Sequence, residues 1–292
     1  MEYQVKQKIK FSVLMSVYAK ENPEWLRLSL DSVFHQTLPP NEVVLIEDGP
    51  ITKALSDVIE EFKSKYHTLK VFPQKENKGL GTALNIGLQH CSYELVARMD
   101  TDDICRPNRF EKQIELFEKD ADLDICSSLI DEFEGNIKNI RSQRLLPEHH
   151  EDIIKYAHQR CPVNHPTVVY KKSKVLAADG YQGFPEDYIL WINMIMNGCK
   201  FYNLQESLLW FRFSYDVYRR RGGWKYAKND IKAQWNFYKM GFTSFSEFLT
   251  NAIIRGIVRL VPNSLRVFTY KYLLRKNLSQ RSRKWQNSAN EL

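Results

Sequence analysis

The sequence predicts an α/β protein with a mostly parallel sheet flanked by helices. Short apolar runs rich in Val, Ile and Phe alternate with segments of helical spacing, an order typical of parallel sheets. Polar residues follow each apolar run, as they do at the ligand-binding edge of open α/β sheets. The chain has 292 residues and is 43% hydrophobic, which suits one large domain with an appendage.

The first half is expected to alternate regularly between strands and helices. Its predicted strands are the buried apolar runs 11–17, 42–46, 69–72 and 95–99. Helical spacing lies between them, and Asn22 with Pro23 suits the N-cap and first position of the first helix. Another helix is expected from Arg106 onward, after the fourth strand.

The second half is expected to be less regular. Its predicted strands are short: 124–130, one near Phe133, and 167–170. A hairpin turn is expected at Gly135 and Asn136. The loop 180–185 should lead into a helix at 188–197.

Three carboxylates follow the fourth strand: Asp100, Asp102 and Asp103. Clustered carboxylates repel one another unless a cation or hydrogen-bond donors compensate. Their hard oxygen ligands suit Mg²⁺ or Mn²⁺, which would leave positions open for phosphate oxygens. The alternative is an acidic loop that caps the next helix. From the residues alone, the two interpretations stay open.

Polar groups at the other strand ends favour a nucleotide-like ligand. Ser16, Tyr18, Asp48 and Lys78 should share one edge of the sheet with the aspartates. The sequence has neither a G-x-G-x-x-G motif after the first strand nor a G-x-x-x-x-G-K-[ST] motif. A dinucleotide site and a P-loop are therefore both unsupported.

A second acidic site, Glu186 and Asp187, precedes the helix at 188–197, with Trp191 one turn later. Carboxylates in the first turn of a helix are commonly stabilised by its dipole, and the residues alone favour this explanation. The alternative is a catalytic base presented beside a sugar-binding aromatic residue.

The charge and cysteine content suggest where the protein works. The formal net charge is +7, and the segment from Lys200 onward is basic, which suits an anionic surface or substrate. No nucleic-acid motif is present. The five cysteines form no C-x-x-C pair, so we expect free thiols in a reducing compartment. No signal-like or membrane-spanning run is visible, which predicts a protein in the cytoplasm or on the cytoplasmic membrane face.

The C-terminal part combines basic and aromatic residues. Residues 218–224 form a basic loop, in which Arg220 and Arg221 are candidates for diphosphate contact, although a solvated face is the commoner explanation. Helical patterns at 245–260 and from Leu265 carry basic residues beside apolar ones, which suits a membrane interface. The alternative is packing on the main domain or in a homodimer. Residues 278–292 are expected to be disordered.

The motifs together resemble family 2 inverting glycosyltransferases of the GT-A fold, and among them bacterial enzymes that build O-antigen or capsule repeat units. The matching stretches follow the family order over roughly residues 10–215: 12–18, 32–37, 47–49, 77–79 with Ala83 and Asn85, 97–103 with Pro107, Arg109 and Phe110, 164–166, and 186–188 with Leu190 and Trp191. The resemblance implies a Rossmann-like catalytic domain at 1–215, with a nucleotide-sugar half at about 10–120 and an acceptor half at about 121–215. A helical extension would follow at 216–277.

The resemblance also implies roles for individual residues. The uridine would be held by Ser16, Tyr18, Glu21 and Asp48, with Asp48 facing the base and Lys78 assisting. Asp100 and Asp102 match the D-x-D motif, which holds the ribose and a metal on the diphosphate. Asp187 matches the general base. The expected acceptor or diphosphate contacts are Glu186, Trp191, His165, Arg220 and Arg221. One departure is Pro50, where the family commonly has Ser.

The implied reaction moves one hexose, with inversion, from a UDP-sugar to a lipid-linked acceptor. UDP-galactose is favoured, then UDP-glucose, and GlcNAc- or GalNAc-diphosphate-lipid is the expected acceptor. The enzyme would sit peripherally on the inner membrane face. Two alternative functions fit the residues less well. A nucleotidyltransferase usually has a Gly-rich loop after the first strand, which residues 18–21 do not provide. A non-catalytic carbohydrate-binding protein has no need of both acidic sites.

Overall fold

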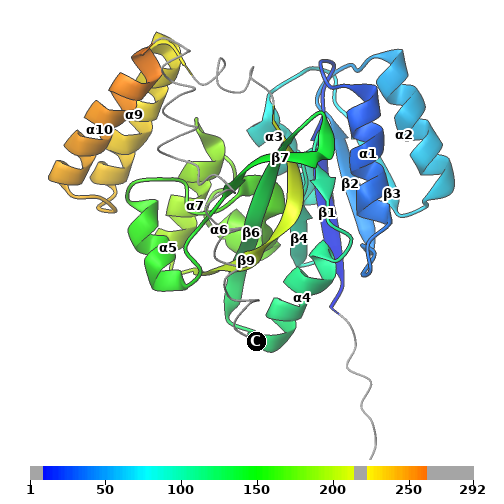
Figure 1. Ribbon diagram of the computed structural model, residues 1–292, viewed down its shortest axis with the longest axis horizontal. Helices are drawn as coiled ribbons and strands as arrows, with labels where there is room; N and C mark the ends of the chain where they lie inside the picture. Colours follow the sequence, from blue (N-terminus) through cyan, green and yellow to red (C-terminus); the bar gives the residue numbers. More distant parts are fainter. Residues whose placement is uncertain (1–8, 214–221, 262–292) are drawn as a thin grey trace, which may run out of the picture.

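The structure is a computed structural model that describes residues 9–213 and 222–261 (Figure 1). Four parallel strands form its first half, in the order β3-β2-β1-β4. These strands are β1 (Phe11–Val17), β2 (Glu42–Glu47), β3 (Leu69–Pro73) and β4 (Leu95–Arg98). The predicted parallel α/β arrangement is confirmed.

Three helices connect these strands: α1 (Pro23–Phe34), α2 (Lys53–Lys65) and α3 (Leu80–His90). The side chain of Asn22 accepts hydrogen bonds from the backbone N–H of Glu24 at 2.9 Å and of Trp25 at 3.3 Å, which confirms the predicted N-cap. Successive residues of β1 pack on opposite sides of the sheet. Val13 and Met15 join a core with α1 and α2, whereas Leu14 joins a second core with α3.

The second half extends the same sheet in the order β4-β8-β6-β9-β5, and β7 pairs with β6. These strands are β5 (Ile104–Cys105), β6 (Leu123–Glu134), β7 (Asn136–Arg144), β8 (Val169–Lys171) and β9 (Lys200–Arg212). β8 runs antiparallel to β4 and β6, whereas β6 and β9 are parallel. The sheet is therefore mixed beyond β4.

Two strand predictions need correction. The two separate strands expected at 124–130 and near Phe133 are one strand, β6, because its irregular pairing with β9 continues through both segments. The strand expected at 167–170 begins two residues later, because a 3₁₀ turn, His165–Thr167, precedes β8. The hairpin turn at Gly135 is confirmed between β6 and β7, with φ of 68°.

Further helices cover the two faces of the sheet: α4 (Arg109–Lys119), α5 (His150–Ala157), α6 (Lys172–Ala177) and α7 (Glu186–Met196). α7 lies on the same side as α3 and buries Leu190, Trp191 and Met194 in their shared core. Its opposite side meets the C-terminal helices, because the rings of Tyr188 and Phe237 lie 5.0 Å apart, centroid to centroid.

The C-terminal helices α9 (Trp224–Lys239) and α10 (Phe245–Leu260) form a hairpin at one edge of the molecule, with α10 outermost (Figure 1). Ser244 and Glu247 form a capping box at the start of α10. The hairpin packs on the main body, which was one of the two expected alternatives. The helix expected from Leu265 lies outside the described residues. Within the described ranges, no helix is long and apolar enough to cross a membrane.

Candidate functional site

A pocket of about 280 Å³ opens at the carboxyl ends of β1, β2 and β4. Five of the residues singled out from the sequence line it: Ser16, Tyr18, Glu21, Asp48 and Asp100. They come from loops that are far apart in the sequence, and the parallel strands bring these loops to one edge. The structure therefore places the predicted donor-binding residues together, and their roles remain predictions.

Asp48 organises the wall of this pocket. Its carboxylate accepts hydrogen bonds from the backbone N–H of Lys78 at 2.8 Å and of Gly79 at 3.0 Å, just before α3. The side chain of Asn77 donates to the backbone carbonyl of Asp48 at 3.0 Å. The two loops approach so closely that a Cβ on Gly49 would lie 2.6 Å from the backbone nitrogen of Asn77. Both carboxylate oxygens of Asp48 therefore fix the entry to α3.

Lys78 contributes differently from the expectation. Its backbone N–H bonds to Asp48, whereas its side chain is exposed and pairs with Glu76 at 3.1 Å. The side chain does not line the pocket in this arrangement. Lys78 thus shapes the pocket through its backbone here.

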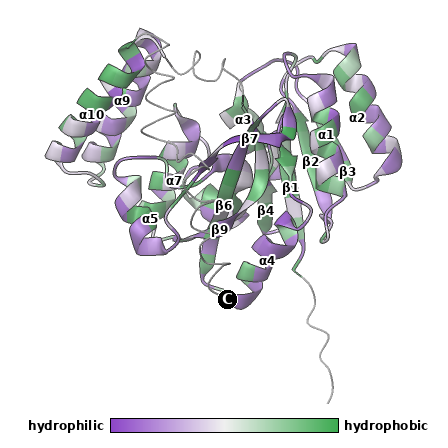
Figure 2. Ribbon diagram, viewed as in Figure 1, coloured by the Kyte–Doolittle hydropathy of each residue, from purple (hydrophilic) through white to green (hydrophobic). Residues whose placement is uncertain are grey.

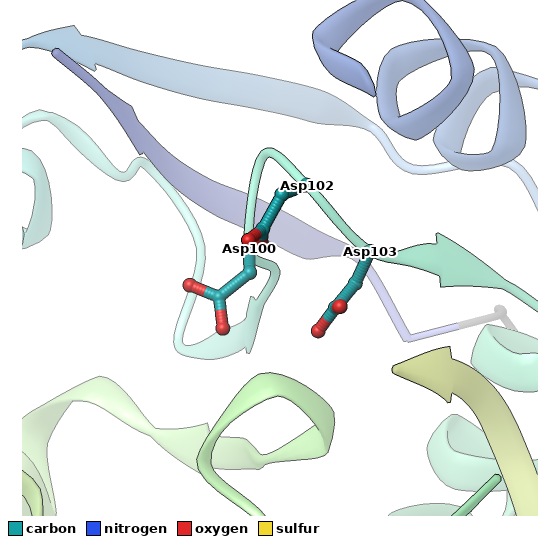
Figure 3. A group of neighbouring side chains, drawn as sticks. All are labelled: Asp100, Asp102 and Asp103. Carbon is teal, nitrogen blue, oxygen red and sulfur yellow. The ribbon is translucent and has the colours of Figure 1, made fainter. Parts of the chain in front are cut away.

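The three aspartates after β4 form a cluster that could hold a cation (Figure 3). Asp100, Asp102 and Asp103 each offer a carboxylate oxygen, and these oxygens lie within 4.8 Å of one another. Carboxylate oxygens at this spacing fit Mg²⁺ or Mn²⁺. The alternative interpretation, in which this loop caps the next helix, is wrong: the N-cap of α4 is Asn108, and Asp103 accepts from the backbone N–H of Arg212 at 2.8 Å.

Two arginines compensate part of this negative charge. The buried guanidinium of Arg98 pairs with both carboxylate oxygens of Asp100. Arg212, at the end of β9, donates from Nε to the backbone carbonyl of Asp102 at 2.8 Å. The guanidinium of Arg212 also lies 4.7 Å from the ring centroid of Trp25. Strands from both halves of the sheet therefore support the aspartate loop.

The raised pKa values of Asp102 and Asp103 indicate that the negative charge of the cluster is only partly compensated. Burial, followed by the neighbouring charge of Asp100, raises the pKa of Asp102 to about 6. Burial and the charge of Asp102 also raise the pKa of Asp103 well above its ordinary value. Both shifts mean that protonation relieves an uncompensated charge, which a bound cation could also do.

Glu186 and Asp187 form the first turn of α7, close to this cluster. A Cβ on Gly81, at the start of α3, would lie 3.4 Å from the Cβ of Glu186. Burial, and then the charge of Asp187, raises the pKa of Glu186. The charge of Arg98 lowers this pKa, and the charge of Asp100 raises it. The two acidic sites found in the sequence are therefore parts of one electrostatic environment.

Asp187 is held by its neighbours. One carboxylate oxygen accepts from the backbone N–H of Tyr188 at 2.8 Å, and the thiol of Cys161 donates to the other at 3.7 Å. The first of these bonds satisfies an N–H of the first helical turn, as the capping interpretation expects. The hydrogen bond to Tyr188 is compatible with both a capping role and a catalytic role of the carboxylate.

Two predicted acceptor contacts lie below the surface. Trp191 has no exposed surface, and His165 is 8% exposed and donates to or accepts from the hydroxyl of Tyr181 at 3.1 Å. Burial and then the charge of Arg98 lower the pKa of His165 well below its ordinary value, so the ring is neutral. A direct acceptor contact by either side chain is therefore not supported by this structure. Arg220 and Arg221 lie outside the described residues.

The sequence analysis missed Arg98 and Arg212. A signal for Arg98 existed, because it is a lone charge in an otherwise apolar strand, two residues before Asp100. Nothing local marked Arg212, whose position depends on the pairing of β9 with β5 and β6.

Comparisons with known proteins identify the family of the chain. The model of Glycosyl transferase family 2 matches residues 12–175. A UDP-Gal:alpha-D-GlcNAc-diphosphoundecaprenol beta-1,3-galactosyltransferase from Escherichia coli is 42% identical over 92% of this chain and 98% of that protein. The amylovoran biosynthesis glycosyltransferase AmsE from Erwinia amylovora is 38% identical, over 89% and 98% of the two chains.

Two solved structures share the fold. Staphylococcus aureus TarS (residues 1–349) in complex with UDP-GlcNAc has a TM-score of 0.66 at 16% identity, over 90% of this chain and 75% of that one. The mannosyltransferase PcManGT from Pyrobaculum calidifontis, in complex with GDP-Man and Mn²⁺, has a TM-score of 0.60 at 13% identity, over 97% and 81%. The family model covers more than half of the chain, and the E. coli relative matches nearly all of it, so this chain belongs to glycosyltransferase family 2 and has the GT-A fold.

Proposed function

We propose that this enzyme is an inverting hexosyltransferase that moves one hexose from a UDP-sugar to a saccharide linked through diphosphate to a polyprenyl lipid. UDP-galactose is the favoured donor and UDP-glucose the next. The expected acceptor is GlcNAc- or GalNAc-diphosphate-lipid, in the biosynthesis of a surface polysaccharide such as O-antigen or capsule. The observation that carries the proposal is the 42% identity, over nearly the whole chain, to a galactosyltransferase with this kind of acceptor.

The pocket supports a nucleotide-sugar donor. Ser16, Tyr18, Glu21 and Asp48 would hold the uridine, since their side chains line one hollow at the edge of the parallel strands. Asp100 lines the same hollow, so the ribose and diphosphate would extend toward the aspartate cluster. The family assignment decides against a nucleotidyltransferase and against a non-catalytic binding protein.

The residues of the cluster fit a divalent cation. Asp100 and Asp102 would hold Mn²⁺ or Mg²⁺, while Asp103 is tied to β9 through Arg212. Such an ion, when bound, stabilises the negative charge of the departing diphosphate. Arg98 would keep the Asp100 carboxylate oriented, because it contacts both of its oxygens from beneath the site.

In the proposed reaction, Asp187 is the base. Its carboxylate takes the proton of an acceptor hydroxyl while the hydroxyl oxygen forms a bond to the anomeric carbon of the donor. The bond from that carbon to the diphosphate oxygen breaks, and UDP leaves with the bonding electron pair. A single displacement inverts the anomeric centre, so an α-linked donor gives a β-linked product. The hydrogen bond from Tyr188 N–H would keep the Asp187 carboxylate in place.

The enzyme would act at the inner face of the bacterial cell membrane, where a lipid-linked acceptor is available, as a peripheral protein. A homodimer of the enzyme is compatible with this location.

A transfer assay tests the proposal. Purified protein would be mixed with Mn²⁺, one of several UDP-sugars and a water-soluble GlcNAc-diphosphate-lipid analogue, and the products weighed by mass spectrometry. We expect the mass of one hexose to be added from UDP-galactose, and the product to disappear with a chelator. Absence of product from every donor, together with absence of UDP binding, would contradict the proposed function.

A further inference from the structure

The outer side of α10 carries a row of exposed apolar residues. Leu249, Ile253, Ile257 and Leu260 recur at helical spacing and are 47%, 53%, 58% and 50% exposed. We call these four residues the α10 stripe. Phe245, one turn before the stripe, is 56% exposed. A continuous apolar row on a solvent-facing helix marks an interaction surface more often than scattered single residues do. Figure 2 shows that the ribbon of α10 has apolar segments between hydrophilic ones.

The other side of α10 already anchors the helix to the protein. Asn251 donates to the backbone carbonyl of His158 at 2.7 Å, and the side chain of Glu247 lies 2.9 Å from the ring of the same histidine. Arg255 donates to buried Asp230 at 2.8 Å and to the carbonyl of Gln159 at 2.7 Å. These contacts hold α10 in place without covering the stripe.

The charge beside the stripe is positive. Four lysines of α9 are exposed and follow helical spacing together with Trp235: Lys225, Lys228, Lys232 and Lys239. Trp235 contacts α10 through Phe248, with ring centroids 5.2 Å apart, so the lysine row borders α10. The described hairpin has two acidic residues: Asp230 is buried against two arginines, and Glu247 lies 2.9 Å from the ring of His158, at the contact with the main body.

We propose that the α10 stripe and the α9 lysines together dock the enzyme on an anionic lipid surface. The apolar side chains would enter the boundary between headgroups and acyl chains, while the lysines would contact the anionic headgroups. This inference rests on the proposed function, since only a lipid-linked acceptor gives the enzyme a reason to work at a membrane. Positive charge beside the stripe favours an anionic lipid surface over a second copy of this basic chain.

The hairpin is attached next to the acidic turn of α7. The ring of Tyr226, in the first turn of α9, lies 4.9 Å from that of Phe184, which precedes Glu186 by two residues. Tyr188, immediately after Asp187, packs on Phe237 of α9. A membrane-bound hairpin would therefore hold the beginning of α7 at a fixed position relative to the lipid surface, where the acceptor is anchored.

Vesicle binding of the full chain tests this surface. Vesicles of phosphatidylglycerol with phosphatidylethanolamine would be compared with vesicles of phosphatidylcholine alone, with neither donor nor acceptor present. We expect cosedimentation with the anionic vesicles only, and an affinity at least about tenfold lower for the double variant Ile253→Glu with Ile257→Glu. Replacing Lys228 with Gln should lower the affinity about fivefold.

The matched control is Leu176→Glu with Met196→Glu, which makes the same charge change at residues that are 42% and 46% exposed on α6 and α7. The control should bind vesicles like the wild type. Circular dichroism would establish that each variant is folded. Unchanged vesicle binding by the α10 variant would overturn the proposal, and so would equal wild-type binding to both kinds of vesicle.

A second copy of the chain is the competing occupant of the stripe. If light scattering finds a wild-type dimer that becomes monomeric in the α10 variant while vesicle binding stays unchanged, the stripe is a dimer interface and the proposal fails. Transfer to the water-soluble acceptor should be the same in variant and wild type. A wild-type protein that binds anionic vesicles as expected but transfers no sugar would contradict the proposed function alone.

Discussion

At the scale of single residues, the negative charges of the site are only partly compensated by positive ones. Three carboxylates gather in one loop, and the guanidinium groups of Arg98 and Arg212 lie beside them. When all three carboxylates are ionised, one negative charge of this group is left without a positive partner, and a bound diphosphate would add more. A divalent cation would oppose both the carboxylates and the diphosphate with its two positive charges, as proposed above.

Asp102 gives this balance a measurable consequence for stability. Its pKa is raised from 3.8 to about 6, so the folded protein holds this proton more tightly than the unfolded chain does. The stabilisation that comes from binding this proton is complete below the pKa of Asp102 in the unfolded chain, 3.8, and is lost as the pH rises through about 6. Above pH 6, the charged side chain lowers the free energy of unfolding by on the order of 1–3 kcal/mol.

Removing this charge should stabilise the metal-free protein. We expect Asp102→Asn to raise the melting temperature by a few degrees at pH 7.5 and by much less at pH 4.5, in calorimetry with a chelator present. Mn²⁺ should stabilise the wild type more than the variant. The control is Asp122→Asn, at an exposed position. A variant that melts below the wild type at pH 7.5 would contradict this account of the cluster.

Substitutions of the two adjacent carboxylates of α7, Asp187 and Glu186, should have different effects on the rate of transfer. Asp187→Asn keeps the shape of the side chain but cannot accept a proton, so we expect transfer to fall by about 10²–10⁴-fold. UDP affinity, measured by calorimetry, should stay within about twofold, because the uridine pocket lies on other elements. Glu186→Gln should reduce transfer less. Near-normal transfer by Asp187→Asn, with loss in Glu186→Gln, would move the role of base to Glu186.

At the scale of elements, the entry to α3 couples the fold to the donor pocket. Asp48 and Gly49 follow β2, and the loop 77–79 lies against them with almost no free space. Gly49 has a φ of +84°, where an L side chain is strained even without the close contact. The position therefore demands glycine for two separate reasons.

Gly49→Ala should consequently damage both stability and binding. The added Cβ would have to move the backbone of Asn77, so we expect a loss of about 1–3 kcal/mol in the free energy of unfolding and weaker UDP binding. Gly198→Ala is the control, since Gly198 has a φ of +74° but open space around its Cβ position. Chemical denaturation and UDP titration would compare them. Equal effects of the two substitutions would show that the close approach at Gly49 is unimportant.

Regular elements could be predicted from the sequence wherever one local signal decided them. The strands β1 and β2 are largely apolar because helices cover both of their faces, and Asn22 with Pro23 marks the start of α1. β9 escaped prediction because its middle is polar, with Asn203, Gln205 and Glu206, and its pairing with β6 shifts register. Long-range pairing decides such a strand, and the sequence pattern does not contain it.

The candidate site divides in the same way. Carboxylates at strand ends could be found, since parallel strands place such residues at a common edge. The burial of individual side chains could not be predicted from the sequence. Trp191 and His165 were expected at an acceptor surface, yet both lie in a core with Tyr181. Their helical and turn positions fit either location, and only the packing of α7 against β8 and α3 decides between them.

At the scale of the whole molecule, the two halves of the chain each bring one part of the reaction site. The parallel strands β1, β2 and β4 end at the pocket proposed for the donor and at the aspartate cluster. The second half supplies α7 with its two carboxylates, and β9 returns Arg212 to the aspartate loop. In the proposed assignment, Asp187 would be the base that faces the leaving diphosphate, and Asp100 and Asp102 would hold the cation rather than attack the sugar. This assignment therefore predicts a single displacement.

The stereochemistry of the product tests this central claim most directly. The purified product of one transfer from an α-linked UDP-hexose would be examined by nuclear magnetic resonance, and the coupling between the first two protons of the new sugar would assign its anomeric configuration. The account predicts a β-linkage, formed by inversion with Asp187 as the base. An α-linkage would require either a covalent intermediate or attack from the other face, and it would contradict the mechanism built on this site.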